Sequence, residues 1–133
     1  MIQQGFTVGN HKWYVMCIYD ITSKQDREKA VELLLTSGYP SDDIDKTLSV
    51  LSEDNCGFTF SDLNERFSVI IISHATSAEQ MYDTIQHELK HVVEHISDYY
   101  DVDPKSEASA YLQGEIARNM FPVATFLVCP KCD

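Results

Sequence analysis

Apolar residues change their spacing along the chain, and each spacing predicts a different element. Residues 12–21 are rich in aromatic and β-branched side chains, which is typical of a strand, and a short strand over 6–8 is expected before it. Residues 57–60 alternate between polar and apolar side chains like an edge strand, and 66–73 form a stronger apolar run. The few residues between the last two strands are short enough for a hairpin.

Helical spacing appears in the remaining segments. It predicts helices over about 24–37, from Ser41, from Ser77 to about Tyr99, and from Asp103-Pro104 to about Asn119, ending before Pro122. Strands and helices mix without regular alternation. We therefore expect one α+β domain over residues 1–133 and not a doubly wound sheet.

Composition narrows the class of protein. The chain has 133 residues, of which 44% are hydrophobic and 23% charged, as in an ordinary globular domain. Its net charge of -11 disfavours contact with phosphates, so we expect no nucleic-acid partner. No apolar run approaches about 20 residues, and no basic-then-apolar leader opens the chain, so we expect no membrane span and a cytoplasmic location.

The long helix that begins at Ser77 carries the sequence His-Glu-Leu-Lys-His over residues 87–91. Residues four apart share one helix face, so His87 and His91 can bind one Zn²⁺ at about 2.0–2.1 Å. Glu88 points about 100° away from His87 around the helix axis. This direction suits a general base acting on water beside the metal, and we expect Glu88 to be the catalytic residue.

The helix that follows opens with Glu-Ala-Ser-Ala-Tyr at 107–111 and stops before Met-Phe-Pro at 120–122. Together with His-Glu-Leu-x-His, this pattern resembles the ImmA/IrrE group of small gluzincin metallopeptidases over about residues 66–122. The resemblance implies a small zincin-like domain, in which a short antiparallel or mixed sheet packs against the motif helix and a following helix that carries a ligand.

The same resemblance implies a complete site. His87, His91 and Glu107 would bind Zn²⁺, and Glu88 would act as the base. The strand over 67–73 would be an edge strand along which a peptide or protein substrate binds by strand pairing.

The third zinc ligand stays open between Glu107 and Glu115. In a tight antiparallel hairpin centred near Val102, the residue level with His91 is near 113, and Glu107 lies about 9 Å away at 1.5 Å per residue. Glu107 is favoured if the motif helix ends early, near 95–98. Small residues in the second helix would then permit a close approach.

His95 continues the histidine row but lies about 12 Å along the helix from His87. That rise is too long for three histidines to bind one ion with bonds near 2 Å. We expect His95 to lie near the site, facing substrate, or to be exposed. Cys129 and Cys132 form half of a zinc-ribbon pattern, and a structural site needs a second pair.

These features predict a zinc metallopeptidase that hydrolyses peptide bonds with a zinc-activated water and Glu88 as general base. One alternative is a non-catalytic binding module with a zincin fold, which would not need a base at Glu88. Another is an interaction protein with structural zinc. Structural zinc sites prefer cysteine-rich coordination, and no cysteine lies near the motif in the sequence.

Overall fold

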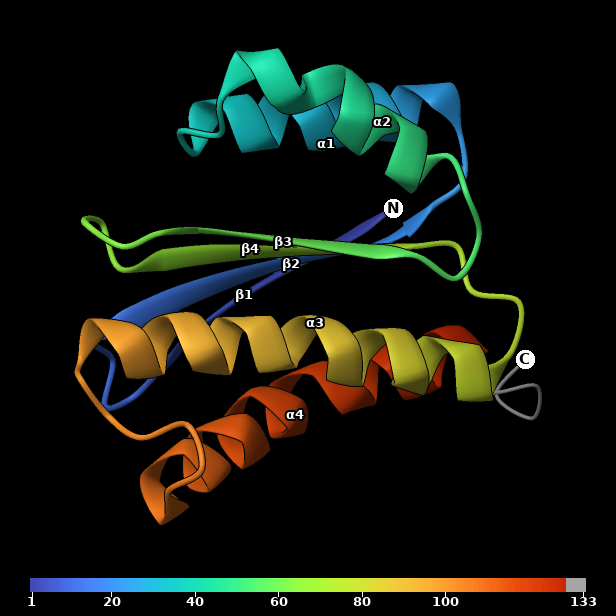
Figure 1. Cartoon of the computed structure of the whole chain (residues 1–133). Coiled ribbons are helices and arrows are strands. Elements are labelled where there is room, and N and C mark those ends of the chain that lie inside the picture. Colours follow the sequence, from blue (N-terminus) through green and yellow to red (C-terminus); the bar gives the residue numbers. More distant parts are fainter. Residues whose placement is uncertain (129–133) are drawn as a thin grey trace.

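The computed structural model of the chain describes residues 1–128 and places a four-stranded sheet between two layers of helices (Figure 1). One face is covered by α1 (Lys24–Thr36) and α2 (Ile44–Leu51), with the short 3₁₀ helix η1 (Ser41–Asp43) between them. The other face is covered by α3 (Ala78–Tyr99) and α4 (Glu107–Val128). The expected α+β class is confirmed, and the sheet is mixed.

The sheet has the strand order β1-β2-β4-β3. Its strands are β1 (Ile2–Val8), β2 (Trp13–Ile21), β3 (Gly57–Asp62) and β4 (Phe67–Ser73). β2 and β4 run parallel, whereas β1 pairs with β2 and β3 pairs with β4 in antiparallel register. β3 therefore lies at one edge of the sheet, as its alternating sequence predicts.

The expectation that residues 67–73 form an edge strand is wrong. β4 is hydrogen-bonded to β2 on one side and to β3 on the other. Its residues from Ser68 to Ser73 are all buried, because helices cover both faces of the sheet. A nearly continuous apolar run is typical of such an interior strand. The edge strand on this side of the molecule is β3.

Two hydrophobic cores lie on the two sides of the sheet. Alternate residues of the central strands face opposite layers, so Ile70 and Ile72 pack toward α3 and α4 while Val69 and Ile71 pack toward α1 and α2. The buried side of α3 contributes six apolar residues to the first core: Met81, Ile85, Leu89, Val92, Val93 and Ile96. This packing fixes which side of α3 remains free for chemistry.

The long motif helix is confirmed, with Ser77 as its N-cap accepting a hydrogen bond from the Gln80 N–H at 3.1 Å. The following helix differs from its predicted bounds at both ends. Asp103 forms a turn before the helix, because its carboxylate accepts from Lys105 N at 2.9 Å, and α4 starts only at Glu107. No helix in the described part of the chain is long and apolar enough to cross a membrane.

At its other end, α4 continues through Pro122 to Val128. Proline in a helix interior removes one hydrogen bond and crowds the preceding turn. Met120 and Ala124 on either side of Pro122 are fully buried, and we attribute the continuation of the helix to this packing. Cys129 and Cys132 lie outside the described residues.

Candidate metal centre

His87 and His91 lie on the side of α3 that the apolar core does not use. Their Nε2 atoms are 3.3 Å apart, and their ring planes are inclined at 80°. Two nitrogens bound to one tetrahedral zinc at about 2.0–2.1 Å are separated by about 3.3 Å. The two rings, here called the histidine pair, thus already have the separation that one zinc ion requires.

Glu88 lies beside the histidine pair and is almost completely buried, with 6% of its surface exposed. Its Oε1 accepts a hydrogen bond from the Thr59 hydroxyl at 2.8 Å. Its Oε2 lies 3.9 Å from His87 Nε2. One carboxylate oxygen is therefore held by β3, and the other is directed toward the first histidine of the pair.

The edge strand β3 makes room for this carboxylate with small residues. Gly57 and Thr59 face α3, whereas Phe58 and Phe60 pack on the opposite face around Tyr39. A Cβ atom at Gly57 would lie 2.5 Å from Glu88 Cγ and 2.9 Å from Glu88 Oε2. Glu88 can occupy its position only because residue 57 has no side chain.

Gly57 and Thr59 are site residues that the sequence motifs do not predict. The signal was present in the alternation Gly-Phe-Thr-Phe-Ser over residues 57–61, which puts every small or polar residue on one face of the strand. That face could be connected to the motif only by knowing that β3 lies against α3.

A pocket of about 330 Å³ opens next to the pair. It is lined by Val50, Asn55, Cys56, Gly57, Asp83, Thr84, His87 and Glu88. The pKa of the Cys56 thiol is raised, first by burial and then by the nearby Glu53 carboxylate. The raised pKa keeps this thiol protonated. The pocket itself offers space for part of a ligand beside Glu88.

His95 lies next to the pair, as expected. Its ring centroid is 6.4 Å from that of His91, and the two planes are inclined at 25°. Its Nδ1 is 2.7 Å from the Ser61 hydroxyl on β3. Burial, followed by the neighbouring His91, lowers the pKa of the His95 ring and favours its neutral form.

The position of α4 determines what it can contribute to the site. Three side-chain hydrogen bonds join the described residues of α4 to α3. Tyr82 Oη and Thr125 Oγ1 are 2.6 Å apart, and Ser97 Oγ and Ser109 Oγ are 2.9 Å apart. Gln113 Nε2 donates to Gln86 Oε1 at 3.5 Å. At about 100° per residue, this contact line lies roughly 120° around the α3 axis from the histidine pair. α4 therefore packs along a different side of α3.

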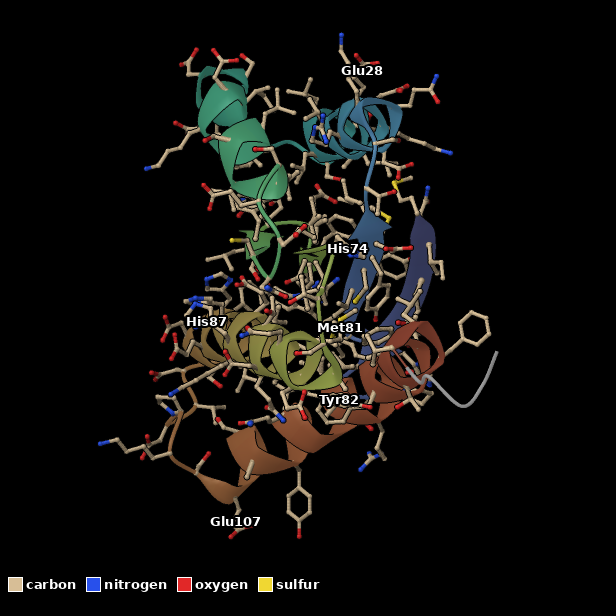
Figure 2. The ribbon with its side chains drawn as sticks, turned by 90° about the vertical axis from the view of Figure 1, so that its right-hand side faces the viewer. Glu28, His74, Met81, Tyr82, His87 and Glu107 are labelled. Atoms are coloured by element: carbon tan, nitrogen blue, oxygen red, sulfur yellow. The ribbon has the colours of Figure 1, made fainter. Side chains whose placement is uncertain are left out.

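The structure does not bring either predicted third ligand to the pair. Glu107 is exposed at the start of α4, on another side of the molecule from His87 (Figure 2). The Glu115 carboxylate instead accepts a hydrogen bond from Gly9 N at 2.7 Å. α3 does not end early but reaches Tyr99, so the condition that favours Glu107 is not met.

Within residues 1–128, no three His, Cys, Asp or Glu side chains converge on a point where they could hold a metal ion. The structure thus brings together His87, His91 and Glu88, and leaves the third protein ligand as a prediction from the resemblance.

Comparison with known proteins adds no further constraint. No protein-family model, no curated protein and no solved structure matches the chain.

Proposed function

We propose that this chain is a zinc-dependent metallopeptidase in which the histidine pair binds the metal and Glu88 is the general base. One observation carries the proposal: the His87 and His91 Nε2 atoms are 3.3 Å apart, beside a buried carboxylate that reaches to 3.9 Å from His87. A scaffold that only holds metal does not need a buried carboxylate at this position.

Zinc bound by such a pair supplies Lewis acidity, which polarises a carbonyl group and lowers the pKa of water. The chain's own contribution is the base. Glu88 Oε1 is engaged by Thr59, which leaves Oε2 to accept a proton from a water molecule near the pair. Glu88 would then return that proton to the amine that leaves when the peptide bond breaks.

The proposed substrate is an extended peptide or protein segment that pairs with the outer edge of β3. Backbone hydrogen bonds along a free sheet edge hold a peptide without regard to its side chains. Thr59 lies on this strand and touches Glu88, so a peptide paired with β3 passes beside the base. The edge of β3 thus takes the substrate-binding role that was expected of residues 67–73, which form the interior strand β4.

Catalytic zinc sites usually have three protein ligands. The family resemblance supplies Glu107 for the third position, and we retain it as part of the proposal. In the arrangement described here α4 packs away from the pair, so Glu107 could bind only after its end of the helix moves.

The test is zinc stoichiometry of the purified protein combined with cleavage of a peptide library. We expect about one zinc per chain and measurable hydrolysis. Glu88→Gln should keep the zinc but lose about a hundredfold or more in rate, because an amide cannot take up the proton. His87→Ala should lose the zinc, and Glu79→Gln, at an exposed carboxylate on the same helix, serves as the control.

Protein that contains no zinc in any preparation would contradict the proposal. Zinc binding without hydrolysis of any peptide would instead support a non-catalytic module. Full activity in Glu88→Gln would leave the metal site intact but reject the mechanism.

A further inference from the structure

A chain of hydrogen bonds connects the core beneath the sheet to His95. The Trp13 indole Nε1 donates to the Ser68 hydroxyl at 2.9 Å. The Ser68 and Ser61 hydroxyls are 2.7 Å apart, and Ser61 is 2.7 Å from His95 Nδ1. Trp13 and Ser68 are 1% and 0% exposed, so the inner end of this chain is closed to water.

The buried end of the chain fixes the direction of every hydrogen bond in it. An indole N–H can only donate, so the Ser68 oxygen accepts from Trp13. In the described part of the protein, the only acceptor within reach of the Ser68 proton is Ser61 Oγ. A buried hydroxyl proton without an acceptor is costly, so Ser68 donates to Ser61.

The direction of the hydrogen bond to His95 follows from the direction of the bond between the two serines. Only one proton can lie between the Ser68 and Ser61 oxygens, and Ser68 supplies it. The Ser61 proton is thus directed to its other partner, His95 Nδ1. A neutral imidazole whose Nδ1 accepts a hydrogen bond carries its proton on Nε2.

This tautomer decides what His95 can do. A metal ligand needs a lone pair, whereas Nε2–H is a donor. The Nε2 edge of the ring faces away from Ser61, and no described residue forms a hydrogen bond with it. The ring is partly buried next to His91, and its hydrogen bond to Ser61 fixes the direction of this N–H.

We propose that the Trp13–Ser68–Ser61 chain holds His95 as its Nε2–H tautomer, and that this N–H donates to a main-chain carbonyl oxygen of a peptide bound along β3. The tautomer assignment stands on the hydrogen bonds alone. The identity of the acceptor rests on the proposed function.

The register of β3 indicates which carbonyl group is bound. Thr59 contacts Glu88 and Ser61 contacts His95, so the base and the donor lie two strand residues apart. Two residues of an extended strand span about 6.6 Å, and a paired peptide repeats with the same period. His95 would therefore bind a peptide residue about two positions from the bond that is cleaved, which makes it a substrate-binding residue.

Long-range ¹H–¹⁵N NMR spectra of the full chain at a pH about 1.5 above the ordinary histidine value of about 6.5 test the tautomer directly. We expect His95 to be protonated on Nε2 alone. Ser61→Ala should produce a mixture of tautomers, because Nδ1 loses its donor. Ser97→Ala is the control, since this buried serine lies on the same helix but contacts α4. A wild-type ring protonated on Nδ1 would overturn the proposal.

Binding of a capped hexapeptide to the Glu88→Gln protein, in which turnover is blocked, tests the acceptor. We expect the His95 Nε2–H resonance to move downfield on binding. His95→Phe should weaken binding by up to about tenfold, the worth of one hydrogen bond. His95→Gln should restore it, because the glutamine amide offers a donor at a similar place.

The outcomes separate the two proposals. Equal peptide affinity in His95→Phe and wild type would overturn the donor role, even in an active zinc enzyme. Protein that lacks zinc and cleaves nothing would reject the metallopeptidase, while the NMR result would still decide the tautomer and the peptide titration would still decide the donor.

Discussion

Thr59 donates a hydrogen bond from its hydroxyl to the Glu88 carboxylate at 2.8 Å, and this contact joins the edge strand to the motif helix. The same hydroxyl lies 3.3 Å from the Glu88 main-chain oxygen. Thr59 on β3 thus orients the carboxylate of Glu88 on α3. This contact holds one carboxylate oxygen, and the other oxygen is directed toward His87.

Thr59→Val should therefore reduce kcat while zinc content stays normal. Valine keeps the shape of threonine but cannot donate, so Glu88 loses the bond that orients it. We expect a loss of roughly tenfold, smaller than that of Glu88→Gln, because the base itself remains. Steady-state kinetics and metal analysis check this, with Thr59→Ser as the variant that keeps the hydroxyl. Equal rates in Thr59→Val and wild type would show that the contact is only structural.

Gly57→Ala should displace Glu88, because the new Cβ would lie 2.5 Å from Glu88 Cγ. We expect a stability loss of about 1–3 kcal/mol, as for other overpacked sites, together with a fall in activity. Gly114→Ala is the matched control. Its Cβ would meet no atom closer than 3.8 Å, and alanine in a helix should add about 0.5–1 kcal/mol. Urea unfolding of both variants checks the contrast, and a Gly57→Ala protein as stable and active as wild type would contradict it.

Glu107→Ala tests whether Glu107 binds zinc, as the family resemblance implies, although α4 packs away from the histidine pair in the structure. We expect zinc affinity to fall at least tenfold, because catalytic zinc sites usually have three protein ligands. That result would mean that the start of α4 moves toward the histidine pair when metal binds. Unchanged affinity would show that Glu107 is not a zinc ligand and that the start of α4 does not need to move when metal binds.

The comparison variant is Glu115→Ala. It removes the carboxylate that accepts from Gly9 N, so stability should fall by about 0.5–1.5 kcal/mol with zinc affinity unchanged. Competition titration with a zinc indicator measures both affinities. Loss of zinc in this variant alone would identify Glu115 as the ligand.

Asp26 predicts a pH-dependent contribution to stability. The Thr22 N–H donates to its carboxylate at 3.2 Å, and this bond lowers the pKa of Asp26 in the folded protein. A folded-state pKa below the unfolded value of about 3.9 stabilises the fold above that pH, and the contribution is lost as pH falls through the folded value. Asp26→Asn should therefore lower the melting temperature at pH 7 but not near pH 2. A constant difference between the two proteins at both pH values would refute this assignment.

Local periodicity was sufficient to predict which side of the motif helix is buried and which side carries the histidine pair. The apolar positions of α3, from Met81 to Ile96, determine which side is buried. They thereby determine that His87 and His91 share the opposite side and that Glu88 lies at the border. The cap at Ser77 and the length of the helix follow from the same pattern.

Relations between elements could not be predicted in this way. The interior position of β4 depends on its pairing with β2, to which only its apolar run gives an indirect clue. The contacts of Thr59 and Ser61 with α3 depend on where β3 lies in the sheet. Pro122 ended the predicted helix because local sequence rules do not include the burial of Met120 and Ala124.

The parallel pairing of β2 with β4 has a consequence for folding kinetics. The two strands are separated in the chain by α1, α2 and β3. Their pairing therefore costs the conformational entropy of closing a long loop before the strand contacts can stabilise the fold. Such non-local pairing slows folding. β3 attaches to β4, and its contacts with Glu88 and His95 depend on that attachment. We therefore expect α3 to become helical early and the contacts of Glu88 and His95 with β3 to form late, only after the centre of the sheet is complete.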